Sequence, residues 1–291
     1  MKFNGFSNSI MGASHEKNGL ACQDSSAFKL SEHYAVAVVA DGHGSKKHFR
    51  SQYGSKFAIE ATIETIDSFY KHREELEANL PDNHEMIIQN IEKQIIANWN
   101  NKFVKHLENN PVTDKERSRF TDEEFETIPP ESYYGSTLIA AVAGENYTFG
   151  LQIGDGSIVV VFDDEKVAMP MAYNELAPAN VTVSICNSNA AGMFSSFYFP
   201  DKKVLSMFCS TDGLYTSFGS ENDFLDYHVI ITSQLTKLSS FKNVILNNLK
   251  KRSHYGTEDD ISLSCIFDED YLREREGLTE KSIEVCVKNN Q

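Results

Sequence analysis

Long apolar runs, paired cysteines and clustered basic residues are scarce in this sequence. Even the longest apolar stretches, such as Ala35 to Ala40, are far too short to cross a bilayer. The first residues turn polar at once, where a signal peptide would continue with apolar residues. Five cysteines stand singly with no C-x-x-C pair, which speaks against a thiolate zinc site or a disulfide scaffold. We therefore expect a cytoplasmic protein without a membrane partner.

The charge balance is acidic. Lysine and arginine together number 27 against 42 aspartates and glutamates, which gives a formal net charge of -15. Nonspecific binding of nucleic acid needs clustered Lys and Arg, so we exclude nucleic acid as a general partner. The excess of carboxylates suits cation binding, although solubility alone would also explain it. A chain of 291 residues, of which 41% are hydrophobic, is able to form one domain with a sizeable core.

Two hydrophobic periods divide the chain. Residues 33–40 read as a buried strand that runs directly into the glycine turn Asp41-Gly42-His43-Gly44. Apolar residues then recur at helical spacing, which predicts two amphipathic helices over residues 52–70 and 85–107. Prolines and charges predict a connecting loop over 109–130.

Beyond that loop the pattern changes. An alternation of apolar and polar residues with a period of two predicts three strands, over residues 136–142, 147–153 and 157–162. Two further apolar runs, 203–209 and 261–267, are also read as strands. They flank a helical region near residues 222–251. Residues 165–200 have mixed polarity and are interpreted as an irregular excursion.

Acidic residues recur at the ends of these strands, beside glycine or another polar residue. A single aspartate there is an ordinary turn residue. Several carboxylates that meet at one edge of a packed sheet repel one another unless a cation neutralises them. Oxygen ligands without cysteine or paired histidines favour Mg²⁺ or Mn²⁺ over zinc. The aspartates in question are Asp24, Asp41, Asp155, Asp212 and Asp259.

At these residues the sequence resembles the type 2C (PPM-type) metal-dependent protein serine/threonine phosphatases, in a divergent branch seen mostly in bacteria. The resemblance covers roughly residues 5 to 268. Six motifs occur in the family's order, namely Cys22-Gln23-Asp24, Val39-Ala40-Asp41-Gly42-His43-Gly44, Gly135-Ser136-Thr137, Ile153-Gly154-Asp155-Gly156-Ser157, Ser210-Thr211-Asp212-Gly213-Leu214 and Asp259-Asp260-Ile261-Ser262.

The resemblance implies an α+β fold, a four-layer α-β-β-α sandwich of two antiparallel sheets flanked by helices. It also implies a phosphatase domain over residues 1–270, followed by a charged tail over 271–291. Two Mn²⁺ or Mg²⁺ ions are expected, with a third bound weakly. By carry-over, Asp41 bridges the two ions and the Gly42 carbonyl coordinates one of them. The other metal positions are expected to involve Asp212 and Asp259 directly, Asp24 through water and Asp155 at the third ion.

The implied reaction is hydrolysis of phosphoserine and phosphothreonine on proteins by a water that the metals activate. His43 is the general acid that the family implies, and its alternative is a turn histidine that faces solvent. Cys22 is a poor candidate nucleophile because no C-x5-R loop follows it.

Two departures bear on activity. Gln23 stands where many members have a glutamate that helps to hold the second metal, and Gly19 stands where an arginine usually grips the substrate phosphate. His15 or Lys17 would have to substitute for that arginine, without its bidentate fork. The alternatives are therefore a weak or inactive pseudophosphatase that acts as a regulatory binding module, and a metal-dependent hydrolase of a small phosphorylated metabolite.

Overall fold

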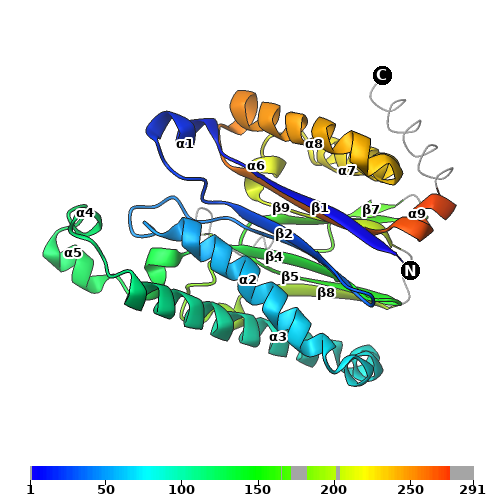
Figure 1. Ribbon diagram of the computed structural model, residues 1–291, viewed down its shortest axis with the longest axis horizontal. Helices are drawn as coiled ribbons and strands as arrows, with labels where there is room; N and C mark the ends of the chain where they lie inside the picture. Colours follow the sequence, from blue (N-terminus) through cyan, green and yellow to red (C-terminus); the bar gives the residue numbers. More distant parts are fainter. Residues whose placement is uncertain (1, 165, 172–181, 201–203, 276–291) are drawn as a thin grey trace.

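The computed structural model describes residues 2–164, 166–171, 182–200 and 204–275, and it places two antiparallel sheets face to face between layers of helices (Figure 1). Sheet A contains, in spatial order, β1 (Phe3–Ile10), β10 (Ile261–Asp268), β9 (Val204–Ser210), β6 (Ser157–Phe162) and β7 (Val167–Ala168). Sheet B contains β2 (Ser25–Leu30), β3 (Ala35–Ala40), β4 (Leu138–Ala143), β5 (Tyr147–Ile153) and β8 (Ser195–Pro200). The predicted four-layer α+β sandwich is confirmed.

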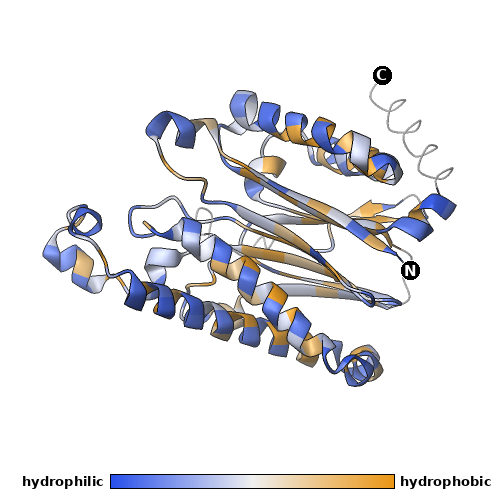
Figure 2. Cartoon of the chain, viewed as in Figure 1, coloured by the Kyte–Doolittle hydropathy of each residue, from blue (hydrophilic) through white to orange (hydrophobic). Residues whose placement is uncertain are grey.

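The long helices form the two outer layers. Sheet B is covered by α2 (Ser51–Tyr70) and α3 (Arg73–Asn109), and sheet A by α7 (Glu221–Gln234) and α8 (Leu238–Arg252). Hydrophilic residues colour much of these helices in Figure 2, whereas hydrophobic residues recur along the strands. The shorter helical elements are α1 (Ala13–Asn18), α4 (Asp114–Arg117), α5 (Asp122–Thr127), η1 (Pro130–Tyr134), η2 (Ala190–Gly192), α6 (Asp212–Tyr215), η3 (Leu235–Lys237), η4 (Ser253–Thr257) and α9 (Glu269–Glu274).

Strand β3 shows why the middle of the sandwich is apolar on both sides. All of its residues are buried, and successive side chains point to opposite faces of the sheet. One set, Ala35, Ala37 and Val39, lies in the core between the two sheets. The other set packs in the core beneath α2 and α3, and consists of Val36, Val38 and Ala40. The near-continuous apolar run in the sequence follows from this double burial.

The segment from 109 to 130 was expected to be a loop, and this expectation was wrong in part. It contains α4 and α5, and each begins with a complete capping box, Thr113 with Glu116 and Thr121 with Glu124. The buried Arg50 guanidinium holds the segment against the domain, since Nε and Nη2 donate to the two Glu116 carboxylate oxygens at 2.8 and 2.9 Å. This bidentate pair makes the connection a fixed part of the structure.

Other predictions differ at the ends of the chain and in the excursion. The region interpreted as irregular contains β8, which pairs with β5 over its whole length, although residues 165 and 172–181 lie outside the described residues. Strand β1 was not predicted, because its sequence is mostly polar. The boundary between domain and tail stays a prediction; α9 spans it, and residues 276–291 lie outside the described residues.

The described part of the chain contains no candidate for a membrane-spanning helix. None of its helices combines the length and the apolar character that crossing a bilayer requires.

Gly54 provides a direct test of the packing between α2 and its neighbours. A Cβ built on Gly54 would lie 1.8 Å from the carbonyl oxygen of Tyr134, while the Gly54 carbonyl accepts from Trp99 Nε1 at 3.0 Å. Glycine to alanine inside a helix normally stabilises by about 0.5–1 kcal/mol. We expect the opposite sign for Gly54→Ala, a loss of about 1–3 kcal/mol in the free energy of unfolding, because the backbones must separate.

Urea denaturation measures this loss, and Gly192→Ala is the matched control. A Cβ at Gly192 meets no atom within 4 Å, so the urea midpoint of Gly192→Ala should stay close to that of the original chain. A Gly54→Ala variant as stable as the original chain would contradict the close approach of α2 to the Tyr134 backbone.

Candidate metal centre

Strand register brings the predicted acidic turns to one edge of both sheets. In sheet B, Asp24 precedes β2 and Asp41 follows β3, and Ser25 pairs with Ala40 between them. Because the strands are antiparallel, the start of one strand and the end of its neighbour lie at the same edge. The Asp155 turn between β5 and β6 reaches this edge too, since Ile153 pairs with the first residue of β4.

Sheet A supplies the remaining carboxylates at the same edge. Asp212 follows β9 and Asp259 precedes β10, and these two strands pair with Leu263 opposite Ser210. Ser210 also pairs with Ser157 at the start of β6, directly after the Asp155 turn. The topology therefore gathers the five aspartates that the sequence singled out, from both sheets.

Asp24 is held from the partner sheet. Its carboxylate is 7% exposed and accepts a hydrogen bond of 2.8 Å from Thr211 Oγ1. The same Thr211 oxygen accepts from the backbone N–H of Ser262 at 2.9 Å. Burial raises the pKa of Asp24 well above its usual range and the nearby Asp260 carboxylate raises it further, while the hydrogen bonds from Thr211 and Ser262 oppose this.

Asp41 and Asp212 lie next to each other. The backbone of Asp41 is anchored by Thr137, whose Oγ1 accepts from the Asp41 N–H at 2.9 Å and whose N–H donates to the Asp41 carbonyl at 2.8 Å. The Asp212 carboxyl lies close enough to Asp41 for its charge to raise the pKa of the Asp41 carboxyl. Their backbone positions are therefore set by strand ends rather than by a free loop.

The electrostatics of the cluster are those of crowded like charges. Burial is the largest cause that raises the pKa of Asp41 well above its usual range, and Asp24, Asp212, Asp259 and Asp155 each raise it further. Burial followed by the charges of Asp155 and Asp259 raises the pKa of Asp212 to about 6. Burial is also the main cause of the raised pKa of Asp259. A divalent cation would relieve this repulsion.

The donor set fits Mg²⁺ or Mn²⁺ better than zinc. Across the described residues, no three His, Cys, Asp or Glu side chains converge into a ready-made ligand cage. The candidate ligands are carboxylate and carbonyl oxygens, which Mg²⁺ and Mn²⁺ prefer, whereas zinc sites commonly use cysteine and histidine. Asp155 is exposed and accepts from Thr182 Oγ1 at 2.8 Å.

Gly42 must be glycine because two other backbone segments approach it closely. A Cβ there would lie 2.7 Å from the carbonyl oxygens of both Gln23 and Ser51. Its N–H donates to the Gln23 carbonyl at 3.1 Å, and Gly42 forms an isolated bridge with Ser136. The turn after β3 is thus locked between the segment that carries Asp24 and the start of α2.

His43 lies beside the cluster, partly buried. Its backbone N–H donates to the Gly135 carbonyl at 3.1 Å, its ring centroid is 5.0 Å from that of His48, and its buried Nε2 has no partner in the described structure. Burial lowers the pKa of His43 to about 4, with smaller contributions from His48 and Lys47. A general acid must carry a proton, and a phosphate anion bound beside His43 would raise its pKa toward the protonated form.

The candidates for substrate phosphate are already engaged. His15 Nδ1 lies 3.0 Å from Asp260 Oδ2, and Lys17 Nζ lies 2.7 Å from Glu258 Oε1. Both contacts hold α1 against the loop before β10. The Cys22 thiol donates weakly to the Asp24 carbonyl at 3.7 Å, and burial raises its pKa, which opposes formation of a nucleophilic thiolate.

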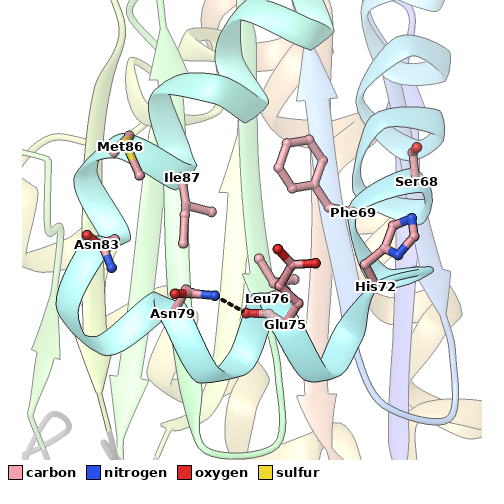
Figure 3. A pocket seen from close by; sticks show the side chains of 9 residues that line it. All are labelled: Ser68, Phe69, His72, Glu75, Leu76, Asn79, Asn83, Met86 and Ile87. Atoms are coloured by element: carbon pink, nitrogen blue, oxygen red, sulfur yellow. Dashed lines mark hydrogen bonds between the residues drawn. The ribbon is translucent and has the colours of Figure 1, made fainter.

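A sizeable cavity lies elsewhere. It measures about 540 Å³ and is bounded only by residues between 68 and 87, at the bend from α2 into α3 (Figure 3). Phe69, Leu76 and Ile87 give it an apolar wall, and Asn79 is turned to donate to the Glu75 carbonyl at 2.8 Å. None of the strand-end aspartates lines it, so it is separate from the candidate metal centre.

Comparisons with known proteins identify the family and the fold of this chain. The family model described as protein phosphatase 2C matches residues 11–250. A bacterial serine phosphatase is 14% identical with a TM-score of 0.55, over 92% of this chain and 100% of that one. The S. agalactiae serine/threonine phosphatase is 14% identical with a TM-score of 0.55, over 91% and 99%. PppA of Pseudomonas aeruginosa is 16% identical with a TM-score of 0.53, over 92% and 98%.

At these identities the solved structures show a shared fold, and no curated protein matches the sequence. The family match ends at residue 250, before Asp259. Asp259 nevertheless lies at the sheet edge of the matched motifs, because it precedes β10, which pairs with β9. On the match over residues 11–250, the chain belongs to the protein phosphatase 2C family.

Proposed function

We propose that this protein hydrolyses phosphoserine and phosphothreonine on proteins with Mn²⁺ or Mg²⁺. The observation that carries the proposal is the meeting of Asp24, Asp41, Asp155, Asp212 and Asp259 at one sheet edge, in a member of this family. Their mutual effect on pKa supports a site that is completed by cations. We further propose that its partner is a phosphorylated protein, and that neither nucleic acid nor a membrane is involved.

Each residue has a distinct part in the proposed reaction. Asp41, Asp212 and Asp259 would hold the ions directly, together with the Gly42 carbonyl. Asp24, fixed by Thr211, would orient water at the site, and Asp155 would serve a third, weakly bound ion. When bound, the ions lower the pKa of water and neutralise the phosphoryl oxygens as charge develops. His43 would give a proton to the leaving serine or threonine oxygen.

The test of this proposal is hydrolysis by the purified protein. A phosphothreonine peptide and p-nitrophenyl phosphate are offered in turn with Mn²⁺, with Mg²⁺ and with EDTA. Turnover that requires the metal and favours the peptide supports a protein phosphatase. Turnover of small phosphorylated metabolites alone would favour the metabolite hydrolase, and absence of all turnover would contradict the proposal.

One contact favours the alternative of a weak phosphatase that serves as a regulatory binding module. Gln23 occupies the position where many relatives are expected to have a glutamate, and its Nε2 donates to Ser51 Oγ at 2.8 Å. The amide is therefore directed toward α2. Strong Mn²⁺ binding with little turnover in the same assay would support this alternative.

His43 gives a second test, because a general acid matters most for a poor leaving group. We expect His43→Gln to lower kcat on the phosphothreonine peptide by about 100-fold, within the usual range for acid–base groups. The loss on p-nitrophenyl phosphate should be under about tenfold, since nitrophenolate leaves without a proton.

His33→Gln is the matched control, because His33 precedes β3 and His43 follows it, and His33 Nδ1 lies 3.1 Å from Glu145 Oε1. It should leave both rates unchanged. Equal losses of His43→Gln on the two substrates would indicate a structural role for that ring.

A further inference from the structure

Asp260 is a heavily bonded acid near the candidate centre, and the proposed mechanism does not use it. It follows Asp259 and is 4% exposed. Its Oδ1 accepts from the Gly12 N–H at 2.6 Å, and its Oδ2 accepts from the Gln23 N–H at 2.6 Å. The third donor is His15 Nδ1, 3.0 Å from Oδ2. One carboxylate thus grips both ends of the segment from Gly12 to Gln23.

The backbone of Gln23 links Asp260 to the turn after β3. Its N–H donates to Asp260, and its carbonyl accepts from the Gly42 N–H at 3.1 Å and from Ser55 Oγ at 2.6 Å. Asp24 is the next residue along the chain. A single residue therefore connects the loop of Asp259 with the segments of Asp24 and Gly42.

Close packing leaves this connection little freedom. A Cβ on Gly12 would lie 2.5 Å from the Asp259 carbonyl carbon and 2.6 Å from the Glu258 oxygen. The Ser14 N–H donates to the same Glu258 oxygen at 3.0 Å, and Ser253 Oγ donates to the Asp259 carbonyl at 2.8 Å. Both sides of the Asp259 backbone are consequently fixed.

The contacts require a carboxylate. Three donors converge on its two oxygens, whereas an asparagine offers one acceptor oxygen and would turn its own N–H groups toward a donor. The charge has a local penalty, because Asp260 lies close enough to Asp24 to raise the pKa of that carboxyl. The carboxylate keeps these three contacts despite this repulsion, which a bound cation would relieve.

We propose that Asp260 is a positioning residue that fixes Asp259, Asp24 and the Gly42 carbonyl relative to one another, and thereby sets the affinity of the site for divalent cations. This inference rests on the proposed function, since it assumes that those three residues bind metal. His15 belongs to the same hydrogen-bond network, because its Nδ1 is the third donor to the Asp260 carboxylate.

The test compares Mn²⁺ binding by calorimetry in the full chain and in Asp260→Asn. We expect affinity to fall by about 10–100-fold, the usual effect of removing a group that orients metal ligands. The hydrolysis rate should then need a correspondingly higher Mn²⁺ concentration, with most of kcat restored at saturation. A residue that only supported folding would lower the melting temperature without moving this metal dependence.

Glu258→Gln is the matched control. It removes one negative charge from the same loop, but its side chain is exposed and bonds to Lys17. Its Mn²⁺ affinity should stay within about twofold, because exposed charges are screened.

His15→Ala keeps the inference testable if Asp260→Asn does not fold, since it removes only one of the three contacts. His15→Ala should weaken Mn²⁺ binding by less than Asp260→Asn does. Combining it with Asp260→Asn should weaken Mn²⁺ binding little further than Asp260→Asn alone. Unchanged Mn²⁺ affinity in His15→Ala and in any folded Asp260→Asn would overturn this inference alone. Absence of Mn²⁺ binding by the unaltered chain would overturn the proposed function and this inference with it.

Discussion

Asp41→Asn is expected to lower hydrolysis of the phosphothreonine peptide by about 1,000-fold or more, the upper range for removing one electrostatic stabiliser. Four neighbouring carboxylates raise the pKa of Asp41, namely Asp24, Asp155, Asp212 and Asp259. The variant loses the charge that would bridge the ions but keeps the shape of the side chain. Steady-state rates at saturating Mn²⁺ measure the effect.

The same variant should be at least as stable as the original chain without metal. The folded-state pKa of Asp41 is raised by burial and by like charges, so its ionisation opposes folding. This penalty is absent below the pKa of the unfolded chain and grows as pH rises toward the folded value. The stability gained by Asp41→Asn in EDTA should therefore be greatest near pH 8 and shrink toward pH 4.

Asp82→Asn is the matched control, an identical change at an exposed position in α3. It should alter neither the rate nor the pH profile of stability. Substantial turnover by Asp41→Asn would refute the proposed site. Strong destabilisation by the same change at pH 8 would show that the Asp41 charge does not oppose folding.

Addition of Mn²⁺ to the metal-free protein should raise its melting temperature by roughly 5 °C or more. At a free concentration 100 times the Kd, binding to the folded state contributes about 2.7 kcal/mol, and each kcal/mol moves the melting temperature of a large domain by about 2–4 °C. Thermal unfolding followed by circular dichroism, with and without Mn²⁺, measures the shift.

This stabilisation should weaken as the solution becomes acidic. Protons compete with the ion for the carboxylates, and burial with the charges of its neighbours raises the pKa of Asp212 to about 6. The Mn²⁺-induced shift should therefore decline as pH falls through about 6, rather than near 4 as for ordinary aspartates. An equal shift in Asp41→Asn would mean that Mn²⁺ binds elsewhere.

The regular parts of the fold were predictable because burial imposes a period on the sequence. Strand β3 and the helices α2 and α3 follow such periods, although α3 begins well before the predicted helix, at Arg73. Strand β1 escaped prediction because its burial pattern is weak and its partner β10 lies 265 residues away at Phe3 and Asp268. The capping boxes of α4 and α5 were visible in the sequence, as Thr113 with Glu116 and Thr121 with Glu124.

The candidate site was predictable to the extent that strand ends determine it. Asp41 and Asp212 stand after apolar strands, and antiparallel pairing brings Asp24 to the same sheet edge as Asp41, and Asp259 to the same edge as Asp212. The importance of Asp260 was not predictable, because a pair of adjacent aspartates does not show which one is buried. Its partners Gly12, His15 and Gln23 are separated from it by 248, 245 and 237 residues. The roles assigned to His15 and Lys17 remain predictions.

The pairing of β1 with β10 also bears on when the candidate metal centre can be complete during synthesis. Sheet B is built from a largely continuous part of the chain, whereas sheet A pairs β10, near the C-terminal end of the described residues, with β1 near their N-terminal end. Contacts between distant residues form late, because a long loop must close first. A nascent chain can therefore assemble sheet B with its helices on the ribosome, but the candidate centre lacks Asp259 until β10 emerges. The proposed activity should therefore appear abruptly at that point, and not in proportion to the length synthesised.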